Sequence, residues 1–205
     1  YEPKNGSGLP SDPFNAIVVP RPIGWISTIS DTGIPHLAPY SFFNAVAYKP
    51  PQVMFSSTGK HAYGGMKDAV ADAQTTGEFV VNIATFELRS KMNASSVPAP
   101  HEVDEFIYSG LTKKISKIVK CPSVAESPVH LECKYIKSVP MLTDDQDTPN
   151  TVVFGQVIGI HIDDRLINNG RLDCLKLRPI GRLGYLDFVE VNNSFSIDRP
   201  VWKSK

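Results

Sequence analysis

A long apolar run at residues 151–162 (TVVFGQVIGIHI) constrains the fold more than any other feature of this chain. Its length and its content of Val and Ile predict a β-strand. Gly155 and Gly159 lie inside it, and glycines within a strand are typical of bulges, or of a bend where a closed sheet turns a corner. The run therefore favours a β-barrel over a flat sheet.

Most other periodic segments also predict strands. The expected strands are residues 25–30, 36–38, 52–56, 78–83 and 130–139, and the expected helices are 66–74 and 86–94, with a helical turn after Asp163. The first two strands form a hairpin around the turn Asp31-Thr32-Gly33. The alternation in 130–139 reverses at Ile136 and Lys137, which predicts a bulge or the strand end there.

Three stretches give weaker signals. Residues 14–19 are predicted as a short strand or docking segment, residues 39–44 as an irregular segment that leaves the sheet, and residues 95–126 as loops. About six strands and two or three short helices, without alternating crossover helices, predict a mostly β protein. The fold class is therefore a β-barrel with peripheral helices, not a doubly wound α/β sheet.

Length and charge exclude several classes of protein. The 205 residues fit one domain, expected at 14–188, between an exposed arm at 1–13 and a tail at 189–205. Lys plus Arg equal Asp plus Glu at 21 each, so no overall charge favours nucleic acid or an anionic membrane. No run is long enough to span a membrane, and the first residues do not resemble a signal peptide.

Cysteine spacing and three short motifs argue against disulfides and metals. Cys121, Cys133 and Cys174 contain no CxxC pair, which favours a reducing cytoplasm. Asp31-Thr32-Gly33 occupies a hairpin turn rather than an aspartic-protease site, and His101-Glu102 lacks the second His of HExxH. The acidic loop lacks the Gly and Glu of an EF-hand; its residues are Asp144, Asp145 and Asp147. The sequence predicts no metal site.

Residues 21–61 combine strand-like apolar runs with many small hydroxyl and amide side chains. Such groups suit a phosphate-bearing ring cofactor, although hydroxyls at strand ends commonly satisfy backbone groups instead. No GxGxxG or GxxxxGK[ST] occurs, so a nucleotide-like ligand has to be held by other means.

A series of blocks, in one order, resembles the flavin reductase-like, FMN-binding split-barrel family over residues 14–188. The blocks are Arg21-Pro22-Ile23, Trp25-Ile26-Ser27-Thr28, Ala38-Pro39-Tyr40-Ser41-Phe42-Phe43-Asn44, Met54-Phe55-Ser56, Lys67-Asp68, Gly77-Glu78-Phe79-Val80-Val81-Asn82, Met92-Asn93, Glu126-Ser127-Pro128, Gly159-Ile160-His161-Ile162-Asp163-Asp164, Leu177-Arg178-Pro179 and Arg182-Leu183-Gly184. The resemblance implies FMN as cofactor, with FAD as an alternative, and a homodimer.

The resemblance also implies roles for individual residues. On the ring and ribityl side it places Thr28, Ser41, Phe43 and Asn44, and on the phosphate side Ser56, Ser57, Lys60 and Lys67. Arg178 or Arg182 would supply a cation near the N1 and O2 edge of the ring, and His161 is the catalytic candidate near the ring face. The alternatives are solvated lysines, core aromatics and a structural histidine.

The function that the resemblance implies is NAD(P)H-dependent flavin reduction, with reduced flavin or electrons passed to a partner oxygenase. NADH and NADPH are equally compatible with the sequence. A flavoredoxin-like electron carrier with tightly bound FMN and a non-catalytic flavin-binding module are the alternatives, because this fold hosts several chemistries. Hydride transfer needs two stacked rings rather than a protein acid or base.

Overall fold

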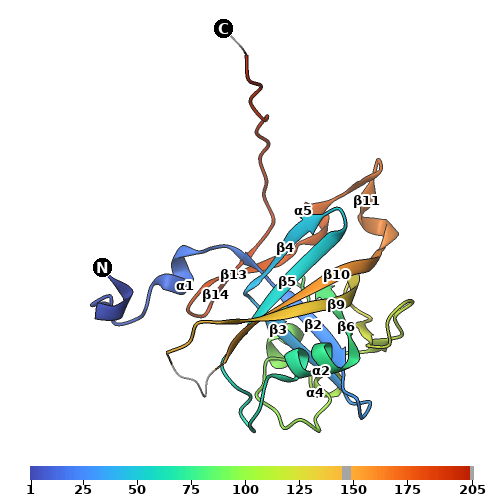
Figure 1. Ribbon diagram of the computed structural model, residues 1–205. Helices are drawn as coiled ribbons and strands as arrows, with labels where there is room; N and C mark the ends of the chain where they lie inside the picture. The colour runs from blue at the N-terminus through green and yellow to red at the C-terminus, as the bar shows by residue number, and fades with distance from the viewer. Residues whose placement is uncertain (145–148, 204–205) are drawn as a thin grey trace.

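The computed structural model describes residues 1–144 and 149–203. Within them, one antiparallel sheet of seven strands forms the body, in the order β3-β2-β6-β9-β10-β5-β4 (Figure 1). Its strands are β2 (Gly24–Ile29), β3 (Pro35–Tyr40), β4 (Phe43–Tyr48), β5 (Pro51–Thr58), β6 (Glu78–Ile83), β9 (Val129–Met141) and β10 (Asn150–Ile162). The fold is mostly β, as the sequence predicts.

The two outermost strands of this sheet, β3 and β4, are neighbours in sequence. Ser41 and Phe42 alone separate the end of β3 from the start of β4. The chain therefore connects the two edges directly, and the sheet curls into a barrel with a seam at Ser41-Phe42. The backbone N–H of Ser56 in β5 donates to the carbonyl of Phe42 at 2.7 Å, which fixes this connection against the barrel.

Irregularities in the longest strand pair curve the sheet. The register between β9 and β10 shifts between Phe154 and Gly155, where Ile136 is skipped, and again between Val157 and Gly159. A Cβ at Gly155 would lie 2.3 Å from Cζ of Phe79, a ring of the core with no exposed surface. These register shifts confirm the expected bulges at Ile136, Gly155 and Gly159. At Gly155 the absence of a Cβ allows the backbone to pass this close to Phe79.

Smaller elements surround the barrel. A second sheet contains β1 (Arg21–Pro22), β13 (Ile180–Gly184) and β14 (Asp187–Glu190), and two short pairs are β7 (Lys113–Lys114) with β8 (Ser123–Val124) and β11 (Ile167–Asn168) with β12 (Arg171–Leu172). The helices are η1 (Pro3–Asn5), α1 (Phe14–Ile17), α2 (Asp68–Thr76), α3 (Arg89–Ala94), α4 (Glu105–Tyr108), η2 (Asp164–Leu166) and α5 (Cys174–Leu177).

Helix α2 packs on the barrel with the apolar residues whose helical spacing in the sequence predicts this helix. Ala69, Val70 and Ala73 are buried in the main core with Phe55 and Phe79. Three and four residues apart, they lie on one face of the helix. Gly77 ends the helix at φ 77°, where its N–H donates to the carbonyl of Ala73. This C-cap requires a positive φ, which glycine adopts without strain.

Two expectations for the fold are wrong. Residues 39–44 do not leave the sheet as an irregular segment, because Pro39 and Tyr40 end β3 and Phe43 and Asn44 begin β4 (Phe43–Tyr48). Residues 14–17 form a short helix rather than a strand. β4 pairs only with β5 and exposes most of its side chains, so it lacks the apolar alternation by which a half-buried strand is recognised. The segment 14–17 has no strand to pair with and shows its apolar side chains to solvent.

Both ends of the chain project from the barrel (Figure 1). Residues 191–203 form no helix or strand, and large apolar side chains there are more than four-fifths exposed, namely Phe195, Ile197, Val201 and Trp202. None of the described helices combines the length and the apolar character that crossing a bilayer demands. Of the acidic loop, Asp145 and Asp147 lie outside the described residues.

Candidate functional site

A cavity of about 160 Å³ opens between β3, the start of α2 and the loop after α3. We call it the β3 cavity. Its lining is His36, Leu37, Ala38, Pro39, Tyr40, His61, Lys67, Asp68, Ala69, Ser95, Ser96, Val97, Pro98 and Glu105. The mixture of apolar walls with convergent charged and hydroxyl groups is typical of a small-molecule site.

Two further cavities continue from the β3 cavity. The seam cavity, about 130 Å³, shares Pro39 and Ser96 with it and is lined also by Ser41 and Arg182. The outer cavity, about 430 Å³, shares Met92, Asn93 and Phe188 with the seam cavity and adds Phe86 and Arg89. Because neighbouring cavities share wall residues, we consider the three together and call them the β3 groove.

At the opposite end, a shallow notch adjoins the groove. Ser57, Met66, Lys67 and Thr151 line this notch, and Lys67 faces both the notch and the β3 cavity. Lys67 occupies the N-cap position of α2, where the first backbone N–H groups of the helix lack intrahelical acceptors. A helix N-terminus beside a lysine favours an anion.

Lys67 and Arg182, at different places along this groove, lack acidic partners. Neither residue is in an ion pair with a carboxylate in residues 1–144 and 149–203. The guanidinium of Arg182 donates to the carbonyl of Tyr185 and lies 4.5 Å from the ring centre of Phe188. Both charges therefore remain available to an anionic ligand.

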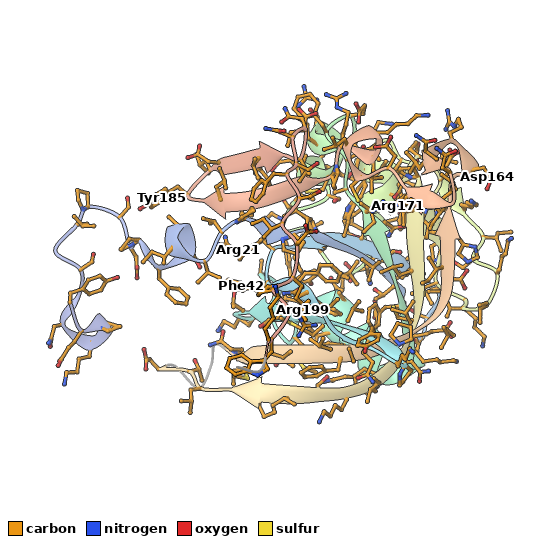
Figure 2. The ribbon with its side chains drawn as sticks, turned by 90° about the horizontal axis from the view of Figure 1, so that it is seen from above. Arg21, Phe42, Asp164, Arg171, Tyr185 and Arg199 are labelled. Carbon is orange, nitrogen blue, oxygen red and sulfur yellow. The ribbon has the colours of Figure 1, made fainter. Side chains whose placement is uncertain are left out.

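Arg21 adds a third cation near the seam. It pairs with Arg182 across β1 and β13, and its guanidinium carbon lies 5.5 Å from the centre of the Phe42 ring (Figure 2). Its Nη1 donates to the carbonyls of Asn15 and Val18, while its Nε is buried without an acceptor. Burial, together with the nearby charge of Arg182, lowers the pKa of Arg21.

Buried hydrogen bonds fix the wall of the β3 cavity. Nδ1 of His36 lies 2.8 Å from Oδ2 of Asp72, and its Nε2 lies 2.9 Å from the carbonyl of His101. Burial alone would lower the pKa of His36, but the hydrogen bonds to Asp72 and His101 and the charges of Asp72 and Asp68 raise it to about 9. His36 is therefore a buried imidazolium at neutral pH.

Asp68, the first residue of α2, connects two more histidines. Its Oδ1 lies 2.5 Å from Nδ1 of His101, and its Oδ2 lies 3.3 Å from Nε2 of His61. The hydrogen bond to Asp68 is the main cause that raises the pKa of His101. Burial is the main cause that lowers the pKa of His61, and the charges of His101, Lys67 and His36 act in the same direction.

The structure brings some of the expected site residues to this groove. Ser41 and Arg182 line the seam cavity, while Ser57 and Lys67 line the notch. Phe43 is half-buried against the main core and lies under Gly24, with its Cδ2 2.5 Å from where a Cβ of Gly24 would stand. Asn44, Ser56 and Lys60 line none of these cavities, and Asn44 and Lys60 are exposed.

Three expected residues have other partners in the structure. Thr28 has no exposed surface and its hydroxyl donates to Asp72 at 2.7 Å, so it lines none of the cavities described. Arg178 forms ion pairs with Glu87 and Glu190, which take up its charge. His161 lines none of the cavities described above, and its Nε2 lies 2.5 Å from Oε1 of Glu132, which argues against a catalytic role.

Sequence reasoning missed much of the groove. The loop after α3 contributes residues 95–98, and α4 contributes Glu105, a buried carboxylate that accepts from the backbone N–H of Leu37. Burial is the main cause that raises the pKa of Glu105. These residues lie in the stretch with the weakest periodicity, and the one available signal is Asp104-Glu105, the acidic start of a short helix.

Comparison with known proteins shows the family of this chain. The profile described as "Flavin reductase like domain" matches residues 17–175. The chain belongs to the flavin reductase-like family. Membership confirms the resemblance carried by the sequence blocks, and together with the solved structures it confirms the split-barrel fold and supports a flavoprotein that binds FMN.

Relatives and solved structures agree with this assignment. An uncharacterized protein of Aquifex aeolicus is 43% identical over 82% of this chain and 83% of its own length. The structure of nitrilotriacetate monooxygenase component B from Bacillus cereus has a TM-score of 0.84 and 27% identity, and covers 89% of this chain and 90% of that one. The flavoredoxin of Desulfovibrio vulgaris shares the fold at a TM-score of 0.74, with 18% identity over 87% and 91% of the two chains.

Proposed function

We propose that this flavin reductase-like protein is an NAD(P)H-dependent flavin reductase that binds FMN in the β3 groove. The observation that carries the proposal is the sequence of chemical environments along one groove. A lysine without an acidic partner stands at one end, a hydroxyl and an arginine follow at the seam, and an aromatic cavity stands at the other end. A phosphate, the polar edge of a flavin ring and a second ring that stacks on it need these environments in this order.

In this arrangement Lys67 and the N-terminus of α2 hold the phosphate at the end of the β3 cavity. Asp68 would repel a phosphate at this position, but the hydrogen bond from His101 offsets its charge. Ser41 and Arg182 bind the polar edge of the ring in the seam cavity. Bound FMN supplies the acceptor for a hydride, and a cation beside the ring favours its anionic reduced form.

The outer cavity is the proposed place for the nicotinamide nucleotide. Phe86 and Phe188 line this cavity next to the seam cavity, and the guanidinium groups of arginines lie over both rings. Arg89 lies 4.0 Å from the ring centre of Phe86 and forms no ion pair with a described carboxylate, so its charge is free for a nucleotide phosphate. The groove is open here, which allows a second ring to reach the flavin.

A partner oxygenase and a homodimer complete the proposal. The Bacillus cereus protein of similar structure is named as component B of a monooxygenase, which supports delivery of reduced flavin or electrons to an oxygenase. The edge strand β4 exposes Val46 and Tyr48, and α1 exposes Phe14 and Ile17. Exposed apolar groups along an unpaired strand edge are typical of an interface, and a second copy would bury them.

Anaerobic reduction of the protein loaded with FMN tests the function. Bleaching of the flavin absorption band by NADH or NADPH is expected, at a rate faster than for free FMN. If the FMN stays oxidised with both nucleotides but is reduced by a redox protein, the protein is an electron carrier rather than an NAD(P)H-dependent reductase. FMN that neither reductant bleaches would point to a binding module, and a protein that binds no flavin would overturn all three functions.

A further inference from the structure

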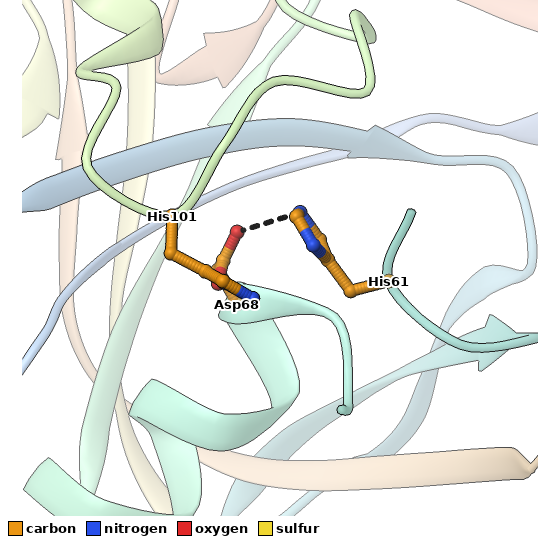
Figure 3. A group of neighbouring side chains, drawn as sticks. All are labelled: His61, Asp68 and His101. Carbon is orange, nitrogen blue, oxygen red and sulfur yellow. Dashed lines mark hydrogen bonds and ion pairs between the residues drawn. The ribbon is translucent and has the colours of Figure 1, made fainter. Parts of the chain in front are cut away.

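Three side chains beside the β3 cavity converge from separate parts of the chain. His61 follows β5, Asp68 is the first residue of α2, and His101 lies on the loop between α3 and α4 (Figure 3). One donor atom from each lies within 4.8 Å of the other two. The three donors are thus close enough to surround a single ion.

We propose that His61, Asp68 and His101 bind a divalent transition-metal ion of the class of Zn²⁺. Two imidazoles and one carboxylate are a donor set that binds such ions, and three protein ligands leave a further coordination position open. The site does not depend on the proposed function, because no flavin contact enters the argument.

The distances support a tetrahedral ion after a small adjustment. Ligands at about 2.0–2.2 Å from Zn²⁺ lie about 3.3 Å from one another in a tetrahedron. Nε2 of His61 and Oδ2 of Asp68 are already 3.3 Å apart. Nδ1 of His101 and Oδ1 of Asp68 are 2.5 Å apart, a hydrogen-bond distance, so the ion displaces the proton between them.

His101 is the ligand that moves. The imidazole rings of His61 and His101 are stacked, with centroids 4.0 Å apart and an angle of 29° between their planes. This angle has to open before one ion can lie in both ring planes. The side chain of His101 is 41% exposed on a loop, whereas that of His61 is 7% exposed, so His101 turns and His61 stays.

The tautomer of His61 changes at the same time. The backbone N–H of Tyr63 donates to Nδ1 of His61 at 3.2 Å, which leaves the imidazole proton on Nε2, facing Asp68. A neutral histidine that ligates through Nε2 carries its proton on Nδ1, so binding of the ion ends the contact with Tyr63. The segment that has to adjust contains Gly64 and Gly65, both at positive φ.

Titration of the full chain with ZnCl₂ by calorimetry tests the site, and Co²⁺ provides a spectroscopic probe of the ligands. The parent and all variants carry Cys174→Ser, because Cys174 is an exposed thiol and thiolates are zinc ligands in their own right. We expect one equivalent of Zn²⁺ to bind and Co²⁺ to give visible absorption. His101→Ala and Asp68→Asn should each weaken binding by about tenfold or more.

His161→Gln is the matched control. His161 also lies 2.5 Å from a carboxylate, but Glu132 is held there by the backbone N–H groups of residues 117–119, and no third ligand among residues 1–144 and 149–203 joins them. This variant should bind Zn²⁺ as tightly as the parent. Absence of stoichiometric binding by the parent, or equal affinity in His101→Ala, would overturn the proposal. Because His101 is exposed, circular dichroism should show an unchanged fold in that variant.

Discussion

Two lysines that the sequence does not distinguish lie in different surroundings. Lys67 is half-buried between the notch and the β3 cavity, whereas Lys60 is exposed and lines none of the cavities described. We predict that Lys67→Ala weakens FMN binding by about 1.5–3 kcal/mol, the cost of a lost charge-assisted contact with the phosphate. Quenching of flavin fluorescence measures the affinity.

Lys60→Ala is the control for that experiment and should change FMN affinity much less. Riboflavin, which lacks the phosphate, should bind the parent and Lys67→Ala equally well. If both lysine variants lost similar amounts of FMN affinity, or if Lys67→Ala kept the parent's affinity for FMN, the phosphate would not bind at this end of the groove.

The buried ion pair of His36 and Asp72 predicts a pH dependence of stability. The pKa of His36 is raised to about 9 in the folded protein, above the value of about 6.5 expected in the unfolded chain. The stabilisation is therefore fully present below about pH 6.5 and is lost as the pH rises through about 9. Denaturant unfolding should show a decrease of about 2 kcal/mol across this range.

His36→Gln should flatten this dependence, because glutamine keeps hydrogen-bonding groups but does not titrate. A parent protein whose free energy of unfolding is constant between about pH 6.5 and pH 9 would show that the imidazolium is not stabilised as described.

At the residue scale, the sequence indicates the chemistry of a side chain but not its partner. Thr28 and Ser41 both lie in blocks shared with the family, and only Ser41 reaches a cavity. The hydroxyl of Thr28 donates a hydrogen bond to Asp72, which lies 44 residues further along the chain. Arg178 and Arg182 differ in the same way. Two glutamates form ion pairs with Arg178, whereas Arg182 lines the seam cavity.

Among the elements, the bulged strand β10 offers a direct test of the barrel geometry. A Cβ at Gly155 would overlap the Phe79 ring of the core, whereas a Cβ at Gly159 would meet Cδ1 of Ile118, the end of a flexible and half-exposed side chain. We predict that Gly155→Ala destabilises the protein by about 1–3 kcal/mol or more, because the core has no room to relax.

Gly159→Ala is the matched substitution in the same strand and should cost clearly less, since Ile118 can turn away. Denaturant unfolding of the two variants measures the difference. Equal stabilities would mean that the strand does not cross Phe79 as closely as described.

Elements with strong local patterns were predictable, and elements defined by their neighbours were not. The glycines of β10 and the broken alternation at Ile136 predicted the bulges, and the spacing of apolar residues predicted α2. Strand β4 was missed because it is an edge strand with little burial to impose a pattern. The loop after α3 was predicted as a loop, but its contribution to the groove was not, because that contribution depends on tertiary packing rather than on periodicity.

For the whole molecule, the exposed apolar edge predicts self-association. Sedimentation should show a dimer, since β4 exposes Val46 and Tyr48 beside unpaired backbone groups. Val46→Asp should shift the equilibrium toward monomer, because a charge cannot be buried there without a partner. A parent that sediments as a monomer at all concentrations would exclude this interface.

The central claim is that one groove, from the notch to the outer cavity, binds the flavin. A crystal structure of the FMN complex tests it most directly. We expect the phosphate at Lys67 and the N-terminus of α2, with the ring in the seam cavity beside Ser41 and Arg182. A flavin bound outside the β3 groove, or with its phosphate away from Lys67, would exclude this binding mode.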